Sequence, residues 1–174
     1  MTTMTPDDVI QVILDSGLRG RGGAGFDGVE MEIAKGNQAE QKYVCCNADE
    51  GDPGAFMDRS VLEGDPHVVL EGNDNCEGNG NRGVTSTSMC VRNIRSQLNV
   101  WKSQFVRREN TECLAKIFFG SGFDFDIDLR LGAGAFVCGE ETALMTSIEG
   151  NRGEPRPRPP FPALKGLFQK TDDF

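Results

Sequence analysis

Residues 20–25 form a glycine-rich segment, Gly-Arg-Gly-Gly-Ala-Gly, that satisfies the pattern Gly-x-Gly-x-x-Gly. Such a segment lets backbone N–H groups approach a phosphate with no side chains in the way. Arg19 and Arg21 place two cations beside these amides, which suits an anionic ligand in a chain of net charge −9. The segment follows an expected helix and not a strand, which departs from the usual dinucleotide-binding context. A glycine-rich surface loop without a ligand therefore stays an open alternative.

Two other segments place carboxylates beside glycine. Residues 47–52 read Asn-Ala-Asp-Glu-Gly-Asp after a strand-like run, and Gly139 precedes Glu140 and Glu141 at an expected helix start. Carboxylates accept hydrogen bonds from the hydroxyls of a ribityl chain or ribose and from flavin N–H groups, whereas they repel phosphate. For the two glutamates, simple charge complementarity with the helix N-terminus is the alternative explanation.

Two phenylalanines, two cysteines and the single histidine are further candidates for a functional role. Phe26 and Phe136 lie beside the loops just described and could stack on a flat ring, or they could belong to the core. Cys45 and Cys138 are set among apolar residues and are expected to be small buried side chains. His67 follows Asp-Pro and is expected to be a polar residue in the first turn of a helix.

The pattern around these segments predicts strands alternating with helices, which is typical of an α/β fold. Capping residues and glycines mark the helix ends, and β-prone or strictly alternating residues mark the strands. Helices are expected from Pro6 to Gly17, from Pro66 through Leu70, along an apolar stripe over 94–105, and from Glu140 to Gly150; strands are expected over 42–46, 84–91 and 123–131.

Size and charge limit the classes of function. The chain has 174 residues and 18.9 kDa, the size of one ordinary domain. Its net charge of −9 disfavours nucleic acid and anionic lipid as partners. The apolar runs are far shorter than the roughly 20 residues of a bilayer helix, and the N-terminus does not read as a signal peptide. We therefore expect a cytoplasmic protein with no direct membrane insertion.

Four motifs together resemble the FMN-binding, NADH-oxidising subunit of respiratory complex I. The version found in NAD(P)-linked iron hydrogenases is the most similar to this chain. These long ungapped motifs occur in the family's order, and the resemblance extends from Thr5 to about Lys170. The motifs are residues 18–26, 47–59, 132–144 and 156–162.

The resemblance implies a Rossmann-like α/β domain that holds FMN over residues 1–152. A proline-rich extended arm over residues 153–174 would lead towards C-terminal domains that lie outside this chain. The implied function is that of an FMN-dependent NADH dehydrogenase module, which passes electrons from NAD(P)H to iron–sulfur subunits of a complex I or hydrogenase assembly. The alternative is a non-catalytic remnant that keeps the scaffold without flavin.

The resemblance also assigns site residues, although the hydride chemistry belongs to the cofactors and no protein acid or base is implied. Phe136 replaces a frequent tyrosine of the family, and Arg158 stands where the family has a basic residue near the nucleotide. The assigned contacts are Gly20, Arg21, Gly22 and Gly23 for the FMN phosphate and ribityl chain, Asn47, Asp49, Gly139 and Glu140 for the flavin, and Glu141, Phe26 and Phe161 for NADH.

Three departures from the family bear on this assignment. Glu30 stands about where the family has a lysine that helps to hold the FMN phosphate, and an acid there would weaken binding. Residues 73–81 are polar where the family has an apolar helix. We expect the family's four-cysteine cluster domain to lie outside these 174 residues, and none of the six cysteines forms a Cys-x-x-Cys pair, so we expect iron–sulfur ligands only in longer relatives.

Overall fold

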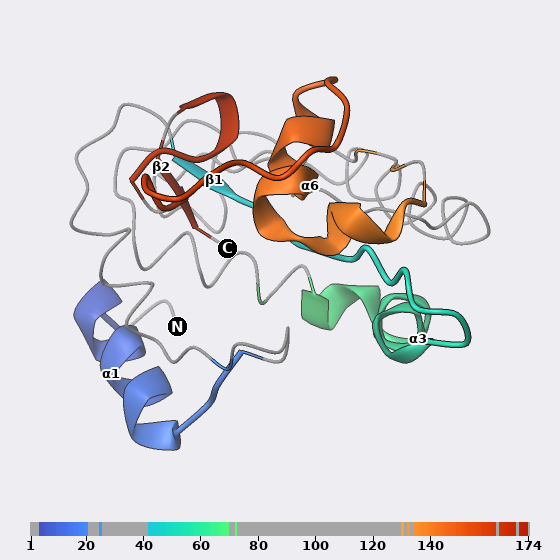
Figure 1. The fold of residues 1–174 in the computed structure, drawn as a ribbon. Coiled ribbons are helices and arrows are strands. Elements are labelled where there is room, and N and C mark those ends of the chain that lie inside the picture. Colours follow the sequence, from blue (N-terminus) through green and yellow to red (C-terminus); the bar gives the residue numbers. More distant parts are fainter. Residues whose placement is uncertain are drawn as a thin grey trace, which may run out of the picture.

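The computed structural model in Figure 1 describes residues 4–20, 25, 42–69, 72, 130, 132, 134–162, 164–169 and 171–173. Glu30, residues 73–81, and the strands and helix predicted between 84 and 131 lie outside the described residues, apart from Arg130. The elements in chain order are α1 (Pro6–Ser16), β1 (Lys42–Val44), α3 (Met57–Gly64), a 3-10 helix (Phe136–Gly139), α6 (Glu141–Ile148), a second 3-10 helix (Leu167–Gln169) and β2 (Thr171–Asp173).

Local signals determine where α1 begins and ends, as predicted. Thr5 caps the helix, and its side chain and backbone exchange hydrogen bonds with Asp8 in a complete capping box. Pro6 occupies the first turn, where its missing N–H costs nothing. Gly17 ends the helix in the left-handed conformation, with φ of 65°.

β1 and β2 lie side by side as a parallel pair, cyan and red in Figure 1. Lys42 is paired with Thr171 and Val44 with Asp173, so the C-terminal segment returns to the strand that precedes the loop of residues 47–52. β1 is shorter than the predicted strand of residues 42–46: it ends at Val44, and Cys45 and Cys46 follow it. The division of the chain at residue 152 stays a prediction, as does the Rossmann-like topology.

The core gathers around α6, which lies close to β1 and to the second 3-10 helix. One buried cluster contains Tyr43, Cys45, Leu144, Met145, Ile148 and Leu167. Each fully buried leucine or methionine in such a cluster contributes about 1.5–3 kcal/mol. Cys45 and Cys138 are buried free thiols, which confirms their expected role as small packed side chains.

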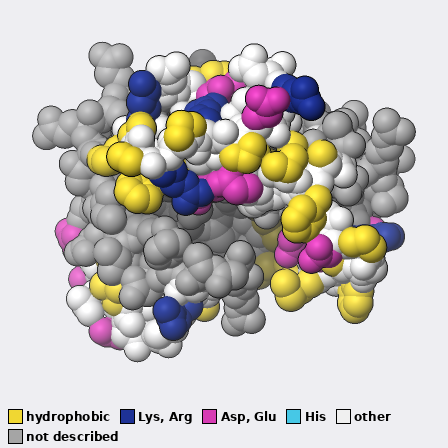
Figure 2. Space-filling view, in the orientation of Figure 1, with side chains coloured by type: hydrophobic (Ala, Val, Ile, Leu, Met, Phe, Trp, Pro, Cys, Tyr) yellow, Lys and Arg dark blue, Asp and Glu magenta, His cyan; other side chains and the backbone are white. Residues whose placement is uncertain are grey.

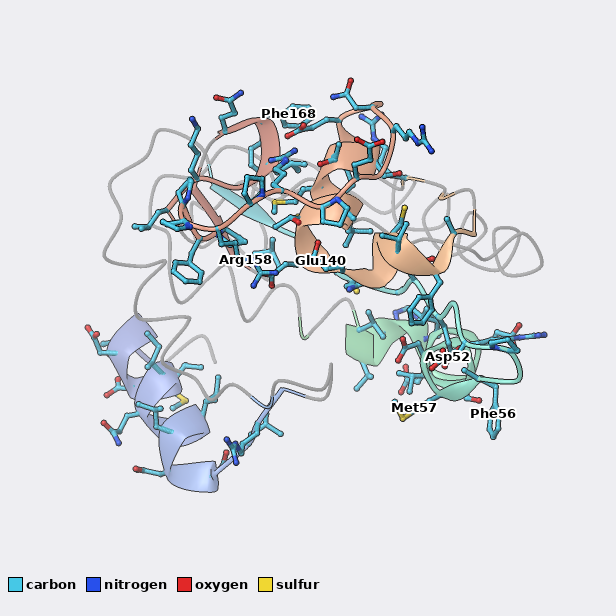
Figure 3. All side chains as sticks on the ribbon, viewed as in Figure 1. Asp52, Phe56, Met57, Glu140, Arg158 and Phe168 are labelled. Carbon is cyan, nitrogen blue, oxygen red and sulfur yellow. The ribbon has the colours of Figure 1, made fainter. Side chains whose placement is uncertain are left out.

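Helix α3 was not predicted, because the side chain that caps its N-terminus belongs to the preceding loop and not to the residue just before the helix. Phe56 at the cap position makes no side-chain hydrogen bond. The Glu50 carboxylate instead accepts hydrogen bonds from the backbone N–H groups of Asp58, at 3.0 Å, and Arg59, at 3.2 Å. Phe56 and Met57 point outward in Figure 3, and Leu62 is the buried residue of the helix.

The helical turn after Asp65 is present at residues 66–69, with His67 exposed, as predicted. Within the described ranges, no helix combines the length and the apolar character needed to cross a bilayer.

Candidate functional site

The structure describes most of the predicted site residues and brings them together in two groups. Arg21, Gly22, Gly23 and Phe26 lie outside the described residues. Gly20 and Phe161 are both described and exposed, and neither takes part in the hydrogen-bonded contacts of the two groups. The first group contains Asn47, Asp49, Phe136 and Gly139, and the second contains Glu140, Glu141 and Arg158.

The first group forms where the loop after β1 meets the 3-10 helix. Asn47 Nδ2 donates to the carbonyl oxygen of Gly139 at 2.7 Å, across 92 residues of sequence. The Asn47 side-chain oxygen accepts a hydrogen bond from the backbone N–H of Asp49 at 3.2 Å. A single amide side chain therefore orients the loop and ties it to the segment that precedes α6.

Two glycines make this close approach possible. A Cβ atom at Gly139 would lie 3.3 Å from the carbonyl oxygen of Asp49, and one at Gly51 would lie 3.0 Å from Phe136 Cα. Real Cβ atoms rarely come so close to backbone, so larger residues would push the two segments apart. The side chain of Phe136 is 70% exposed and therefore does not belong to the core.

The second group begins with Glu140, which caps α6. Its Oε2 accepts hydrogen bonds from the N–H groups of Thr142 and Ala143, both at 3.0 Å, and from the Thr142 hydroxyl. Partial burial by itself would raise the pKa of Glu140, but the hydrogen bonds from Thr142, Ala143 and Arg158 outweigh it and lower the pKa. Glu140 is therefore ionised at neutral pH.

Arg158 reaches back from the proline-rich segment and bridges both glutamates. Its Nη2 pairs with Glu140 Oε1, and its Nη1 lies 2.8 Å from Glu141 Oε1. The Glu140 and Arg158 side chains meet at the centre of Figure 3, and Figure 2 shows basic and acidic side chains adjacent at the same place. Burial raises the pKa of Glu141; the Arg158 cation opposes this shift, and the Glu140 charge adds to it.

Replacing the bridging cation is expected to raise the pKa of both carboxyls. In Arg158→Gln, Glu140 and Glu141 lose the positive charge that lowers both values. The depressed folded-state pKa of Glu140 adds stability that is present above the unfolded-state pKa and lost as the pH falls through the folded-state pKa. As the pH rises from acidic to neutral, the free energy of unfolding should therefore increase less in Arg158→Gln than in the wild type.

Carbon-13 NMR titration of labelled glutamate carboxyls and urea unfolding at acidic and neutral pH would measure both effects. Arg152→Gln is the matched control, because its pair with Glu154 is far more exposed. Titration curves of Glu140 and Glu141 that are unchanged in Arg158→Gln would contradict the bridge.

The ends of the glycine-rich segment are held by an arginine. Arg19 Nε donates to the carbonyl oxygen of Gly25 at 2.7 Å, and Gly25 has a φ of 67° that favours glycine. The Arg19 side chain thus joins the residue before the glycine-rich segment to the segment's last glycine.

Sequence reasoning missed Thr142 and Arg156, which connect α6 to the proline-rich segment. Thr142 is only 3% exposed and accepts a hydrogen bond from the backbone N–H of Arg156 at 2.8 Å. Its contact with a residue 14 positions away has no signature in a local pattern.

The arrangement as a whole is rich in acceptors. The carboxylates of Asp49, Glu140 and Glu141 suit ligands that donate hydrogen bonds through hydroxyl or ring N–H groups. The exposed rings of Phe136 and Phe161 offer flat apolar surface to a planar ligand. The described residues of the two groups include no histidine.

Comparison with known families and proteins agrees with this description. The family model of the Nuo51 FMN-binding domain matches residues 13–169. The chain is similar to the NADP-reducing hydrogenase subunit HndC of Solidesulfovibrio fructosivorans, with 52% identity over 97% of this chain and 34% of that protein. It is also similar to one of the NADH-quinone oxidoreductase subunits of Rhizobium meliloti, with 40% identity over 94% of this chain and 39% of that protein.

A solved structure resembles the fold. The chain superposes on a chain of the NAD+-reducing [NiFe]-hydrogenase in the H2-reduced state, with a TM-score of 0.85 and 32% identity over 99% of this chain and 29% of that one. The chain thus spans between about a quarter and two fifths of the length of these relatives.

Proposed function

The chain belongs to the Nuo51 FMN-binding domain family, and from this premise we propose that it binds FMN and serves as an NAD(P)H-oxidising module. The observation that carries the proposal is the glycine-lined contact between the loop after β1 and the segment before α6. It gathers Asn47, Asp49, Gly139 and Glu140, the residues assigned to the flavin.

The described residues fit such a cofactor. At Gly139 and Gly51, a Cβ atom would press against the opposite segment, so glycine is needed to keep the two segments this close. The carboxylates of Asp49 and Glu140 suit the hydroxyl and N–H donors of a ribityl chain and flavin ring, and the Asn47 amide orients this loop. For the phosphate end, we propose Gly20, Arg21, Gly22 and Gly23, with Arg19 adding positive charge beside the loop.

Substrate binding is assigned to neighbouring residues. Glu141 would accept hydrogen bonds from the ribose hydroxyls of NAD(P)H. Arg158 would offset the negative charge of Glu140 and Glu141, which would otherwise repel the phosphates of NAD(P)H. The rings of Phe26, Phe136 and Phe161 flank the planar parts of the nucleotide. A bound flavin supplies the redox chemistry, because it accepts a hydride from NAD(P)H and can return electrons singly.

The protein's own contribution is binding and orientation. The glycines allow close approach to the backbone, and the hydrogen-bonded Glu140 keeps a fixed direction and a stable charge. The proposal needs no proton transfer by a side chain. The rate of NAD(P)H oxidation is therefore expected to depend on how well these groups orient the nicotinamide and flavin rings.

We further propose a Rossmann-like α/β topology for the domain, a cytoplasmic location, and delivery of electrons to iron–sulfur subunits of a complex I or hydrogenase assembly. The names of the relatives support the last statement, since they are subunits of an NADP-reducing hydrogenase and of NADH-quinone oxidoreductase. The sequence itself contains no Cys-x-x-Cys pair for a cluster of its own.

A flavin-binding experiment tests the proposal. The purified chain, after incubation with FMN and desalting, is expected to be yellow and to lose its visible absorption when NADH is added without oxygen. FMN at a hundredfold excess over its Kd should raise the free energy of unfolding by about 2.7 kcal/mol. Ferricyanide reduction by NADH should follow the flavin content.

The opposite result would favour the non-catalytic alternative. A chain that is folded by circular dichroism but retains no flavin, shows no stabilisation by FMN and reduces no ferricyanide would be a scaffold without the cofactor. Stoichiometric iron and acid-labile sulfide in the isolated chain would contradict the proposal that electrons leave through a partner.

A further inference from the structure

Thr142 lies at a junction between the acidic pair and the proline-rich segment. Its hydroxyl accepts a hydrogen bond from the backbone N–H of Arg156 at 2.8 Å and contacts Glu140 Oε2. The direction of both bonds is determined by chemistry, because a backbone N–H only donates and an ionised carboxylate only accepts. The single hydroxyl proton of Thr142 therefore points at Glu140.

Arg156 holds the same segment to α6 through its side chain. Its guanidinium donates to Thr146 Oγ1 at 3.0 Å, to Glu149 Oε2 at 2.5 Å and to the carbonyl oxygen of Gly166 at 3.1 Å. Arg158 follows two positions later and bridges Glu140 and Glu141. Both oxygens of the Glu140 carboxylate are thus held by groups that the proline-rich segment helps to place.

We propose that Thr142 is a positioning residue for this site. Its hydroxyl ties the backbone of Arg156 to Glu140, and it thereby sets the direction in which the Glu140 carboxylate meets a bound flavin. The flavin part of this inference rests on the proposed function, whereas the hydrogen-bonded junction belongs to the protein alone.

The charges around Glu140 agree with this role. Arg158 faces it from the proline-rich segment, Glu141 lies next to it on α6, and the Asp49 carboxylate lies beside Gly139 from the loop after β1. Partial burial favours the protonated form, so Glu140 depends on its hydrogen-bond donors and on Arg158 to stay ionised. The hydrogen bond from the Thr142 side chain is the leading cause that lowers its pKa.

The test compares three variants of the full chain. Thr142→Val keeps the branched shape and removes the hydroxyl, Thr142→Ser restores the hydroxyl, and Thr146→Val is the matched control one turn later. Thr146 also binds Arg156 but makes no contact with Glu140. The control therefore loosens the proline-rich segment without removing a hydrogen bond from the carboxylate.

Two readouts separate positioning from general damage. Carbon-13 NMR titration of the apoprotein follows the pKa of Glu140, and quenching of FMN fluorescence gives the Kd of FMN. Thr142→Val removes the hydrogen bond to Glu140 together with the one from the Arg156 N–H, and it is expected to raise the pKa of Glu140 and to weaken FMN binding by about tenfold. Thr142→Ser should return both values close to those of the wild type.

Two results would overturn the inference. One is an unchanged pKa of Glu140 in folded Thr142→Val; the other is a change in Thr146→Val as large as in Thr142→Val, because the segment as a whole would then be the cause. If Thr142→Val does not fold, Thr142→Ser against Thr142→Ala gives the same comparison. Absence of FMN binding by the wild type would overturn the proposed function, while the titration would still test the junction.

Discussion

Gly153→Ala is expected to lower the free energy of unfolding by about 1–3 kcal/mol, the range for overpacking a filled interior. A Cβ atom at residue 153 would overlap Cys138 Sγ, and it would lie 3.4 Å from the carbonyl oxygen of Ala143 and 3.5 Å from Ser147 Cβ. Cys138 is buried and short, so its sulfur has little room to move aside. Urea unfolding followed by circular dichroism would measure the loss.

A double-mutant cycle identifies the contact that causes this loss. In Cys138→Ala combined with Gly153→Ala, the sulfur is gone and the added methyl group has space. The double variant should therefore be more stable than the sum of the two single effects, with a coupling energy of about 1 kcal/mol or more. Gly64→Ala is the control, because a Cβ there meets nothing within 4 Å. Equal stability of Gly153→Ala and Gly64→Ala would contradict the packing described for Gly153.

Gly51→Ala is expected to weaken FMN binding by about tenfold to a hundredfold while the fold is retained. Its Cβ would lie 3.0 Å from Phe136 Cα and 3.3 Å from Cδ2 of the same ring. The nearest obstacle is backbone, so the loop after β1 and the 3-10 helix must move apart. Small displacements of groups that place a ligand or cofactor have effects of this size on function.

The Kd of FMN and the flavin content after desalting would check this prediction, with circular dichroism as the measure of folding. Gly64→Ala again serves as the control and should keep the wild-type Kd. Wild-type flavin retention by Gly51→Ala would show that the contact between Gly51 and Phe136 does not shape the flavin site. Loss of secondary structure in Gly51→Ala would show that this contact supports the fold and not only the site.

Local sequence signals were enough to predict the helices whose capping residues lie within the helix or next to it. For α1, the cap at Thr5, the proline and the closing glycine are all within the helix or next to it. For α6, the carboxylate of Glu140 accepts hydrogen bonds from the backbone N–H groups of Thr142 and Ala143. Such signals act over three or four residues, so they can be read directly from the sequence.

The family could be recognised from the sequence for a related reason. Its glycine-rich, carboxylate-rich and proline-rich motifs are each continuous in sequence, and together they support the family resemblance that the Nuo51 FMN-binding domain match confirms. Which of these motifs touch one another was not contained in the motifs themselves. All of the assigned cofactor contacts stay predictions, and those at residues 21–23 and 26 also lie outside the described residues.

The tertiary structure decided what joins the motifs. The Asn47 amide binds Gly139 across 92 residues, β1 pairs with the C-terminal β2, and Glu50 caps a helix that local patterns did not reveal. Arg158 and the Thr142 hydroxyl then hold the Glu140 carboxylate from two directions. These contacts arise because packing brings distant polar groups into a partly buried space, where each must find a partner. Residue types alone showed what chemistry was available, and the folded chain determined which partner each group has.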